Sequence, residues 1–300
     1  MMRIAVTGAT GFVGGHLLPR LIEAGHEVRA LTRKPKARCA GITWIDGALN
    51  DDTALARLCE GCDAVIHVAG VVSADFAGFD AGNRLGTLAI VRAAETAGAT
   101  RFVHISSLAA REPQLSMYGA SKHAAEDVVT ASSLDWRIVR PTAIYGPEDT
   151  GMLDIFRMAK HGFVVLPPTG SMSVIHVDDL CRLIVALTES PDGRVLYEAD
   201  DGVPGGWTHR EFAAALGKAM DRKGIALPMS KSVLSIASRL DVLFRGKNAK
   251  LTADRVGYLT HPDWTIAPGH RVPATLWTPQ IATQAGLANT ANWYREHRWL

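Results

Sequence analysis

The sequence predicts an α/β fold in which a doubly wound parallel sheet is followed by a smaller, discontinuous C-terminal lobe. The first observation is an alternation, up to about residue 147, of short apolar runs with stretches whose apolar residues recur at helical spacing. The second is a glycine-rich turn between the first run and the first such stretch. Because strands that alternate with helices usually lie parallel, this pattern indicates a sheet with helices on both faces.

Each element follows from its local pattern and from the glycines that end helices. Gly25 and Gly98 stand where predicted helices stop, and glycine is the residue that most easily adopts the left-handed backbone found there. The expected strands are residues 3–7, 27–33, 42–46, 64–69, 101–106 and 135–141. The expected helices are residues 11–24, 51–60, 83–98 and 117–132.

The glycine-rich turn has the order of strand, turn and helix that a dinucleotide site requires. Gly8 permits the turn, Gly11 lets the backbone approach a pyrophosphate, and Gly14 lets helix and strand pack closely. The amide groups at the start of the helix then face the phosphates. We therefore expect residues 1–165 to form a dinucleotide-binding Rossmann domain, with cofactor contacts from Gly8, Thr10, Gly11, Phe12, Val13 and Gly14.

The second predicted strand indicates which dinucleotide binds. An NAD site usually has a carboxylate at the end of this strand for the ribose hydroxyls, but the chain has no Asp or Glu between Val28 and Ile45. Arg33 and Lys34 stand there instead, and a guanidinium suits a 2′-phosphate by charge and geometry. The alternative is an ordinary solvated basic loop, which leaves the missing carboxylate unexplained. NADP is therefore the expected cofactor, ahead of NAD.

A phenol and an ammonium share one face of the last of these helices. Tyr118 and Lys122 are four residues apart, and residues at that spacing are neighbours on a helix. A lysine beside a tyrosine favours the phenolate and lowers the pKa of the phenol from about 10. Such a phenol can exchange a proton with an alcohol or a carbonyl near neutral pH. The pair therefore predicts proton transfer at a substrate oxygen.

Together these residues make the chain similar to a known family. It resembles the extended short-chain dehydrogenase/reductases, of the NAD(P)-dependent epimerase/dehydratase type, and the matching motifs occur in family order. Besides the glycine turn and the Tyr118/Lys122 pair, these motifs are Asp46-Gly47, His67-Val68-Ala69-Gly70, Asn83 with Gly86-Thr87, Ile105-Ser106-Ser107, Arg140 to Pro147, and His176 to Asp179.

The resemblance implies a role for several of these residues. It implies catalysis by Ser107, Tyr118 and Lys122, in which Ser107 holds the substrate oxygen, Tyr118 transfers the proton, and Lys122 holds the nicotinamide ribose and tunes Tyr118. It implies that Asp46 contacts the adenine amino group. Asn83 is a weaker carry-over, equally consistent with a structural residue at a helix start. The other residues for which it implies cofactor contacts are Gly47, Ala69, Gly70, Pro141, Thr142 and Ile144.

The chain departs from the family pattern in three places, which leaves an alternative function open. His67 and Val68 replace frequent asparagines, Leu108-Ala109 replaces the Asp-Glu pair of sugar dehydratases, and the interval from Ser107 to Tyr118 is short. The expected function is an NADP-dependent oxidoreductase or epimerase acting on a carbonyl or a secondary alcohol by hydride transfer. The first alternative is a non-catalytic, NADPH-holding protein resembling the accessory subunit of respiratory complex I. A second alternative is a cofactor-sensing regulator.

Composition and charge argue against several kinds of partner, but they do not identify a function. A net charge of +2 gives no reason to expect nucleic acid as a partner. No metal is expected, because His176 beside Asp178 reads as a structural turn before a helix, and the four cysteines read as reduced thiols. Without an apolar run long enough to span a bilayer or a charged leader, the chain is expected to be cytoplasmic. The partners expected are a small-molecule substrate and, by resemblance, a second copy in a homodimer.

The last third of the chain is expected to hold the substrate. Residues 166–300 should form mainly the substrate-binding lobe, with 173–200 returning to the Rossmann domain. Five of the seven tryptophans lie there, which favours a largely apolar or aromatic substrate over a nucleotide-sugar: Trp207, Trp264, Trp277, Trp293 and Trp299. For Trp293 and Trp299 the preferred interpretation is that they attach the small lobe to the sheet.

An amphipathic stretch at residues 231–250 combines an apolar stripe with basic residues. The stripe consists of Val233, Ile236, Leu240, Leu243 and Phe244. It is expected to point inward, because burial stabilises each large side chain by about 1.5–3 kcal/mol. A solvated face is the preferred explanation for the basic residues, and a membrane surface is the alternative. These residues are Lys231, Arg239, Arg245, Lys247 and Lys250, with Asp241 as the one acid.

Overall fold

A computed structural model describes residues 1–246, 249 and 251–300, so Lys247 and Lys250 of the predicted basic set lie outside the described residues. The chain forms two compact units. The first comprises Met1–Pro141, Val177–Ala199 and Gly269–Thr278, and the second comprises Thr142–His176, Asp200–Pro268 and Pro279–Leu300. The chain thus returns to the first unit at Val177. That residues 1–165 bind the dinucleotide and residues 166–300 mainly bind the substrate stays a prediction.

A parallel sheet of seven strands forms the centre of the first unit and confirms the predicted fold class. Its order is β11-β6-β5-β4-β1-β2-β3, and every neighbouring pair is parallel. The order reverses between β1 and β4, which is where open α/β sheets bind their ligands. The strands are β1 (Arg3–Thr7), β2 (Glu27–Thr32), β3 (Ile42–Asp46), β4 (Ala64–His67), β5 (Arg101–Ile105), β6 (Asp135–Pro141) and β11 (Val195–Ala199).

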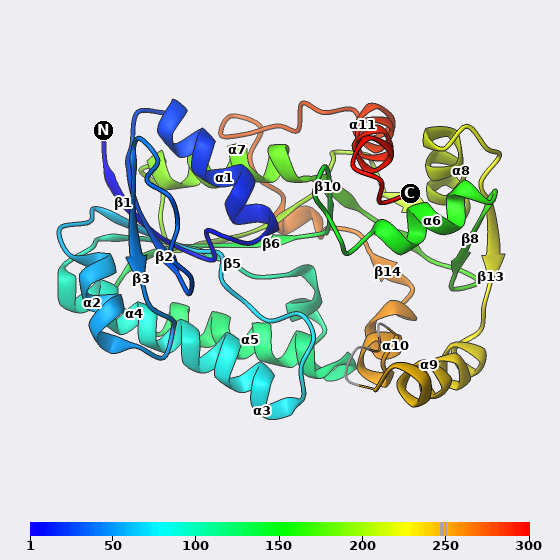
Figure 1. Ribbon diagram of the computed structural model, residues 1–300, viewed down its shortest axis with the longest axis horizontal. Coiled ribbons are helices and arrows are strands. Elements are labelled where there is room, and N and C mark those ends of the chain that lie inside the picture. The colour runs from blue at the N-terminus through cyan, green and yellow to red at the C-terminus, as the bar shows by residue number, and fades with distance from the viewer. Residues whose placement is uncertain (247–248, 250) are drawn as a thin grey trace. The chain divides into compact units, whose positions relative to one another are not determined.

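Helices cover both faces of this sheet (Figure 1). One face carries α1 (Phe12–Glu23) and α7 (Val177–Glu189), which pack together. The other carries α2 (Asp52–Cys59), α4 (Gly86–Ala97) and α5 (Met117–Thr130). The core is built from their apolar stripes and the buried strands, with Leu55, Leu58, Ile90, Phe102 and Val129 fully buried. The predicted helix at 83–98 corresponds to α4, which starts at Gly86. A short helix, α3 (Phe76–Phe79), and a π-helical turn, Asp80–Leu85, come directly before it.

The second unit consists of three small sheets and five helices within its described residues. The sheets pair β7 (Ala143–Tyr145) with β10 (Val174–His176), β8 (Phe163–Leu166) with β13 (Ile225–Pro228), and β9 (Ser171–Met172) with both β12 (Trp207–Thr208) and β14 (Asp263–Trp264). The helices are α6 (Leu153–Lys160), α8 (His209–Ala219), α9 (Lys231–Arg245), α10 (Ala253–Leu259) and α11 (Thr283–Glu296).

Aromatic residues build the core of the second unit. Phe156, Phe212 and Tyr294 are fully buried, and Trp293 and Trp299 pack against the same cluster. These two tryptophans therefore pack within the second unit, and their predicted packing of the small lobe onto the sheet stays a prediction. None of the described helices, in either unit, is long and apolar enough to cross a membrane.

Helix α9 contradicts the prediction for its apolar stripe. Val233, Ile236, Leu240, Leu243 and Phe244 are all exposed, so the expectation that this face points inward is wrong. The helix packs against the short helix α10, and only Leu234 and Ser238 are buried on it. A single small neighbour covers one side of a helix and leaves the other side open.

Candidate active site

The predicted phosphate-binding turn has the close contacts that require glycine. Gly8 has a φ of +73°, and a Cβ placed on it would lie 2.5 Å from the amide nitrogen of Ala69. A Cβ on Gly14 would lie 2.2 Å from the carbonyl oxygen of Gly8, so α1 packs directly on the end of β1. Gly11 is exposed and caps α1 without a side-chain hydrogen bond or an acidic residue in the first turn. The amides of Phe12 and Val13 at the helix start therefore suit an anion.

The residues predicted to contact the adenosine half of the cofactor lie at the ends of β2 and β3. These neighbouring strands pair Thr32 with Asp46, which brings Arg33 and Lys34 to the same edge of the sheet as Asp46 and Gly47. Both basic side chains are exposed. A Cβ on Gly47 would lie 2.2 Å from the Cβ of Ala54, so only glycine lets α2 pack this closely. The arrangement leaves two cations at the edge where a 2′-phosphate is expected.

The turn after β4 connects the glycine turn to the candidate catalytic helix. The backbone of Ala69 lies against Gly8, and its amide donates to Oγ1 of Thr7 at 3.4 Å. A Cβ on Gly70 would lie 3.6 Å from Nζ of Lys122 and 3.2 Å from Oδ1 of Asn83. The structure therefore brings together the β1 turn, the β4 turn and Lys122, which lie far apart in the sequence.

Lys122 is nearly buried on the face of α5 that also carries Tyr118. Its Nζ donates to the carbonyl oxygen of Ile105 at 2.8 Å, which holds the ammonium at the end of β5. Burial lowers the pKa of Lys122 to about 8, and the carboxylate of Glu126 acts in the opposite direction. The Tyr118 ring is half-buried and lies 6.0 Å from the ring of Phe79.

Two short 3-10 turns accommodate the short interval between Ser107 and Tyr118. Ser107 caps the first turn, Leu108–Arg111, by accepting a hydrogen bond from the amide of Ala109, and the second turn is Pro113–Leu115. The first turn packs against the start of α5, because a Cβ on Gly119 would lie only 2.7 Å from the carbonyl oxygen of Ala109. The Ser107 turn therefore lies against the first turn of the helix that carries Tyr118.

Asn83 lies in the π-helical turn and is buried. Its Nδ2 donates to Oγ of Ser121 at 2.8 Å and to the carbonyl oxygen of Val71 at 3.0 Å, while its Oδ1 accepts from the amide of Val71 at 2.7 Å. The amide side chain thus links the β4 turn to α5. The sequence was equally consistent with Asn83 as a structural residue at a helix start, but it could not show that Asn83 bonds to Val71 and Ser121.

His67, which departs from the family pattern, is buried among hydrogen-bond partners that give it a structural role. It lies between two threonine hydroxyls, with Nδ1 at 2.6 Å from Thr7 and Nε2 at 3.0 Å from Thr87. Burial, with a smaller effect of the Lys122 charge, lowers the pKa of His67 to about 3. His104 stacks on it at 5.3 Å and is buried as well, and burial lowers its pKa well below the ordinary value. Both rings are therefore neutral packing elements near neutral pH.

The remaining predicted contacts divide between the two units. Pro141 ends β6 in the first unit, whereas Thr142 and Ile144 belong to the second. Their expected contact with the nicotinamide stays a prediction. Among the described residues no group of three or more histidine, cysteine or acidic side chains could hold a metal ion.

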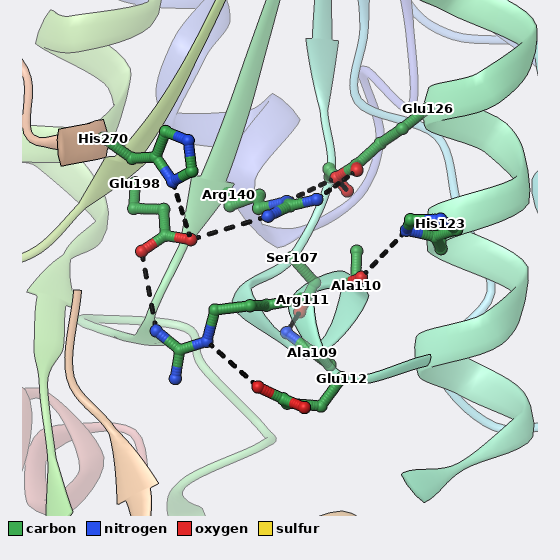
Figure 2. A network of polar contacts seen from close by, with 11 residues as sticks. Ser107, Ala109, Ala110, Arg111, Glu112, His123, Glu126, Arg140, Glu198 and His270 are labelled. Carbon is green, nitrogen blue, oxygen red and sulfur yellow. Dashed lines mark hydrogen bonds and ion pairs between the residues drawn. The ribbon is translucent and has the colours of Figure 1, made fainter. Parts of the chain in front are cut away.

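A buried network of charges beside the Ser107 turn was not predicted from the sequence (Figure 2). The guanidinium of Arg140 donates to both carboxylate oxygens of Glu126, at 2.9 and 2.6 Å, and lies 3.5 Å from Glu198 on the neighbouring strand. Ser106, adjacent to Ser107, donates from its Oγ to the same Glu126 carboxylate. Glu198 also pairs with Arg111 of the Ser107 turn at 3.6 Å. The network therefore holds the turn from two sides.

One sequence signal could have identified Glu126. It lies eight residues after Tyr118 and four after Lys122, so the three residues follow one helical face. Glu198 gave no such signal, because its partner Arg140 is distant in sequence and becomes a neighbour only when β11 pairs with β6.

Comparison with known families and sequences agrees with this geometry. Residues 4–198 match the model described as the NAD dependent epimerase/dehydratase family. A protein from Caulobacter vibrioides named ceramide reductase is 37% identical over 308 residues, covering 99% of this chain and 96% of the relative. A relative from Stigmatella aurantiaca, a ketoreductase of 4-hydroxy-2-methyl-3-oxo-4-farnesyl-3,4-dihydroquinoline-1-oxide, is 32% identical over 68% of this chain and 69% of its own length.

Solved structures share the fold at lower identity. The structure of MoeE5 with UDP-glucuronic acid and NAD superposes with a TM-score of 0.76 at 21% identity, covering 99% of this chain and all of that one. The UDP-glucose 4-epimerase of Thermus thermophilus gives a TM-score of 0.70 at 22% identity, covering 98% of this chain and 99% of that chain. At such identities the likeness concerns the fold alone.

Proposed function

Because this chain belongs to the NAD dependent epimerase/dehydratase family and is an NAD(P)-dependent enzyme of the extended short-chain type, we propose that it reduces a ketone with NADPH. The observation that carries the proposal is the packing of the Ser107 turn on α5, the helix that presents Tyr118 and the buried Lys122 on one face. Reduction is favoured over epimerisation because two relatives above 30% identity are named as reductases.

The side chains and backbone amides at the predicted cofactor site of the first unit match the chemistry of NADP. The exposed Gly11 and the uncapped start of α1 suit a pyrophosphate. Arg33 and Lys34 form no ion pair within the described part of the chain, so both charges are available for a 2′-phosphate. Asp46 would hold the adenine, and Lys122 the nicotinamide ribose. NAD lacks the phosphate that these two cations would bind, so it is the less favoured cofactor.

The chain's own residues would handle the substrate oxygen. The reduced nicotinamide, when bound, supplies a hydride to the carbonyl carbon. Tyr118 donates its phenolic proton to the oxygen as charge develops there, and Ser107 donates a hydrogen bond to the same oxygen. The Lys122 ammonium stabilises the phenolate that remains on Tyr118. Oxidation of the product alcohol runs through the same steps in reverse.

We propose a largely apolar carbonyl compound as the substrate, in preference to a nucleotide-sugar. The names of the two relatives specify a ceramide and a farnesyl-bearing ring ketone, both with long apolar chains. The structures that contain nucleotide-sugars support the fold only. A cytoplasmic location, expected from the sequence, is a further proposal. A homodimer formed through α4 and α5 is another, which rests on the resemblance alone.

The experiment is a turnover assay that follows loss of the reduced nicotinamide. Purified protein is offered NADPH with long-chain 3-oxo amides, short ketones or nucleotide-sugars. We expect turnover with the long-chain ketones, and a roughly 10²- to 10⁴-fold loss of kcat in Tyr118→Phe, because the proton donor is gone. The dissociation constant for NADPH should stay near the wild-type value. Tight NADPH binding without Tyr118-dependent turnover of any compound would reject catalysis, and turnover of nucleotide-sugars alone would reject the substrate class.

A further inference from the structure

Helix α9 presents a continuous apolar stripe to solvent. Val233, Ile236, Leu240, Leu243 and Phe244 are 47, 59, 49, 76 and 82% exposed. Their spacing of three, four, three and one residues places them on one face of the helix. Contiguous exposed apolar surface of this kind marks an interaction site in a folded protein.

The opposite side of α9 attaches it to its own unit. Leu234 and Ser238, four residues apart, are buried and lie about 150° around the helix from the centre of the stripe. Asp241 accepts a hydrogen bond from the amide of Leu251 at 2.8 Å and pairs with Arg245 at 3.2 Å. The helix is therefore held through one side, and the stripe faces away from that attachment.

Positive charge accompanies the stripe. Residues 231–250 contain five Lys or Arg and one Asp, a net charge of 5 − 1 = +4 in this segment. Lys231 and Arg239 are exposed, and Arg239 borders the stripe in the helical projection. The one acid, Asp241, is already paired with Arg245. A partner that covers the stripe must therefore be apolar where it meets the leucines and anionic at its edge.

We propose that α9 is a membrane-surface helix, which lies in the plane of an anionic bilayer with its apolar stripe at the boundary between headgroups and acyl chains. An amphipathic helix with large apolar side chains on one face, a cation at the edge of that face and a net positive charge has the composition of such helices. Arg239, at the border of the stripe, contacts the anionic headgroups with a long side chain that extends past the apolar edge. At about 1.5 Å per residue the 15-residue helix is about 22 Å long, which is about four turns on the surface. This inference is independent of the proposed reaction.

The test is co-sedimentation of the full chain with lipid vesicles. Vesicles of phosphatidylcholine with about 30% phosphatidylglycerol are compared with pure phosphatidylcholine at about 0.15 M and 0.5 M salt. The wild type should bind the anionic vesicles at least about tenfold more tightly than the neutral ones, and less tightly at the higher salt. The double variant Leu243→Glu/Phe244→Glu should bind the anionic vesicles at least about tenfold more weakly than the wild type.

A matched control separates this stripe from general surface hydrophobicity. Val72 and Phe76, in the first unit, are 74 and 73% exposed, and Val72→Glu/Phe76→Glu should bind vesicles like the wild type. Circular dichroism verifies the folding of each variant. If the Leu243/Phe244 variant does not fold, Arg239→Gln serves instead and should weaken the preference for anionic lipid. Equal loss in the control, no binding by the wild type, or dissociation of a wild-type dimer by the α9 substitutions would overturn the proposal.

Discussion

At the scale of single residues, the protonation of Lys122 is the most sensitive quantity in the candidate site. The side chain is buried, so removal from water favours its neutral form, and the pKa falls to about 8. Glu126, one turn further along α5, favours the charged form. The proposed chemistry needs the ammonium, because only the charged lysine stabilises the phenolate of Tyr118. The charge of Glu126 therefore extends toward alkaline pH the range in which Lys122 stays protonated.

The first prediction concerns Glu126→Gln. Because the carboxylate raises the pKa of Lys122, its neutralisation should lower that pKa below about 8, and the lysine should lose its proton at a lower pH. The alkaline limb of kcat/KM should therefore move toward neutral pH, as a pH–rate profile with NADPH would show. Glu27→Gln, which alters a surface pair with Arg3, is the control and should leave the limb in place. An unchanged limb in Glu126→Gln would contradict the coupling.

The second prediction concerns cofactor choice at Arg33. Replacing Arg33 by Asp removes a charge-assisted hydrogen bond to the 2′-phosphate, which costs about 1.5–3 kcal/mol. NADPH binding should weaken by roughly 10- to 150-fold, while NADH binding should stay constant or improve. Fluorescence titration with both nucleotides measures this change. A wild type that binds NADH as tightly as NADPH would disprove the proposed NADP preference.

At the scale of elements, the contact between α5 and the Ser107 turn positions the proposed catalytic groups. The contact depends on Gly119, since a Cβ there would lie 2.7 Å from a backbone carbonyl oxygen that cannot rotate away. The Glu126–Arg140–Glu198 network fixes the same turn through Ser106 and through the pair of Glu198 with Arg111 (Figure 2). Two independent supports therefore hold the Ser107 turn against one helix.

The third prediction is that Gly119→Ala displaces this turn. Overpacking should destabilise the fold by about 1–3 kcal/mol, partly offset by the helix propensity of alanine of about 1 kcal/mol. Turnover should fall at least about tenfold through displacement of Ser107, since misplaced groups lose rate steeply. Gly15→Ala is the stability control, because a Cβ on this helical glycine meets nothing within 4 Å. Thermal unfolding and the NADPH assay measure both effects, and wild-type kcat in Gly119→Ala would refute the positioning role.

At the scale of the whole molecule, binding of a cofactor to the folded state should stabilise the protein. The fourth prediction uses NADPH at about 100 times its dissociation constant, which contributes about 2.7 kcal/mol. For 300 residues the unfolding entropy is about 0.6 kcal/mol per kelvin, so Tm should rise by about 4 °C. NADH at the same concentration should give a smaller rise in a thermal-shift measurement. An equal rise with both nucleotides would contradict the roles of Arg33 and Lys34.

The sequence alone determined the fold class and the candidate groups of the site. Predicted strands and helices of the first unit lie within a few residues of the observed ones, because their periodicity and ending glycines are local signals. The glycine turn and the Tyr118/Lys122 pair were also visible in the sequence, because each motif is a short run of neighbouring residues. The sheet, and with it the edge at which the predicted cofactor residues gather, follows from the alternation of elements.

Only the tertiary structure decided the features that depend on distant partners. The pairing of β11 with β6 placed Glu198 beside Arg140, and no local pattern connects these residues. The sequence also predicted an inward apolar face for α9, but burial depends on what packs against a helix, and α10 covers only one side of it. Amphipathic spacing shows that a helix has an apolar face, and the neighbours that the fold supplies determine whether that face is buried or exposed.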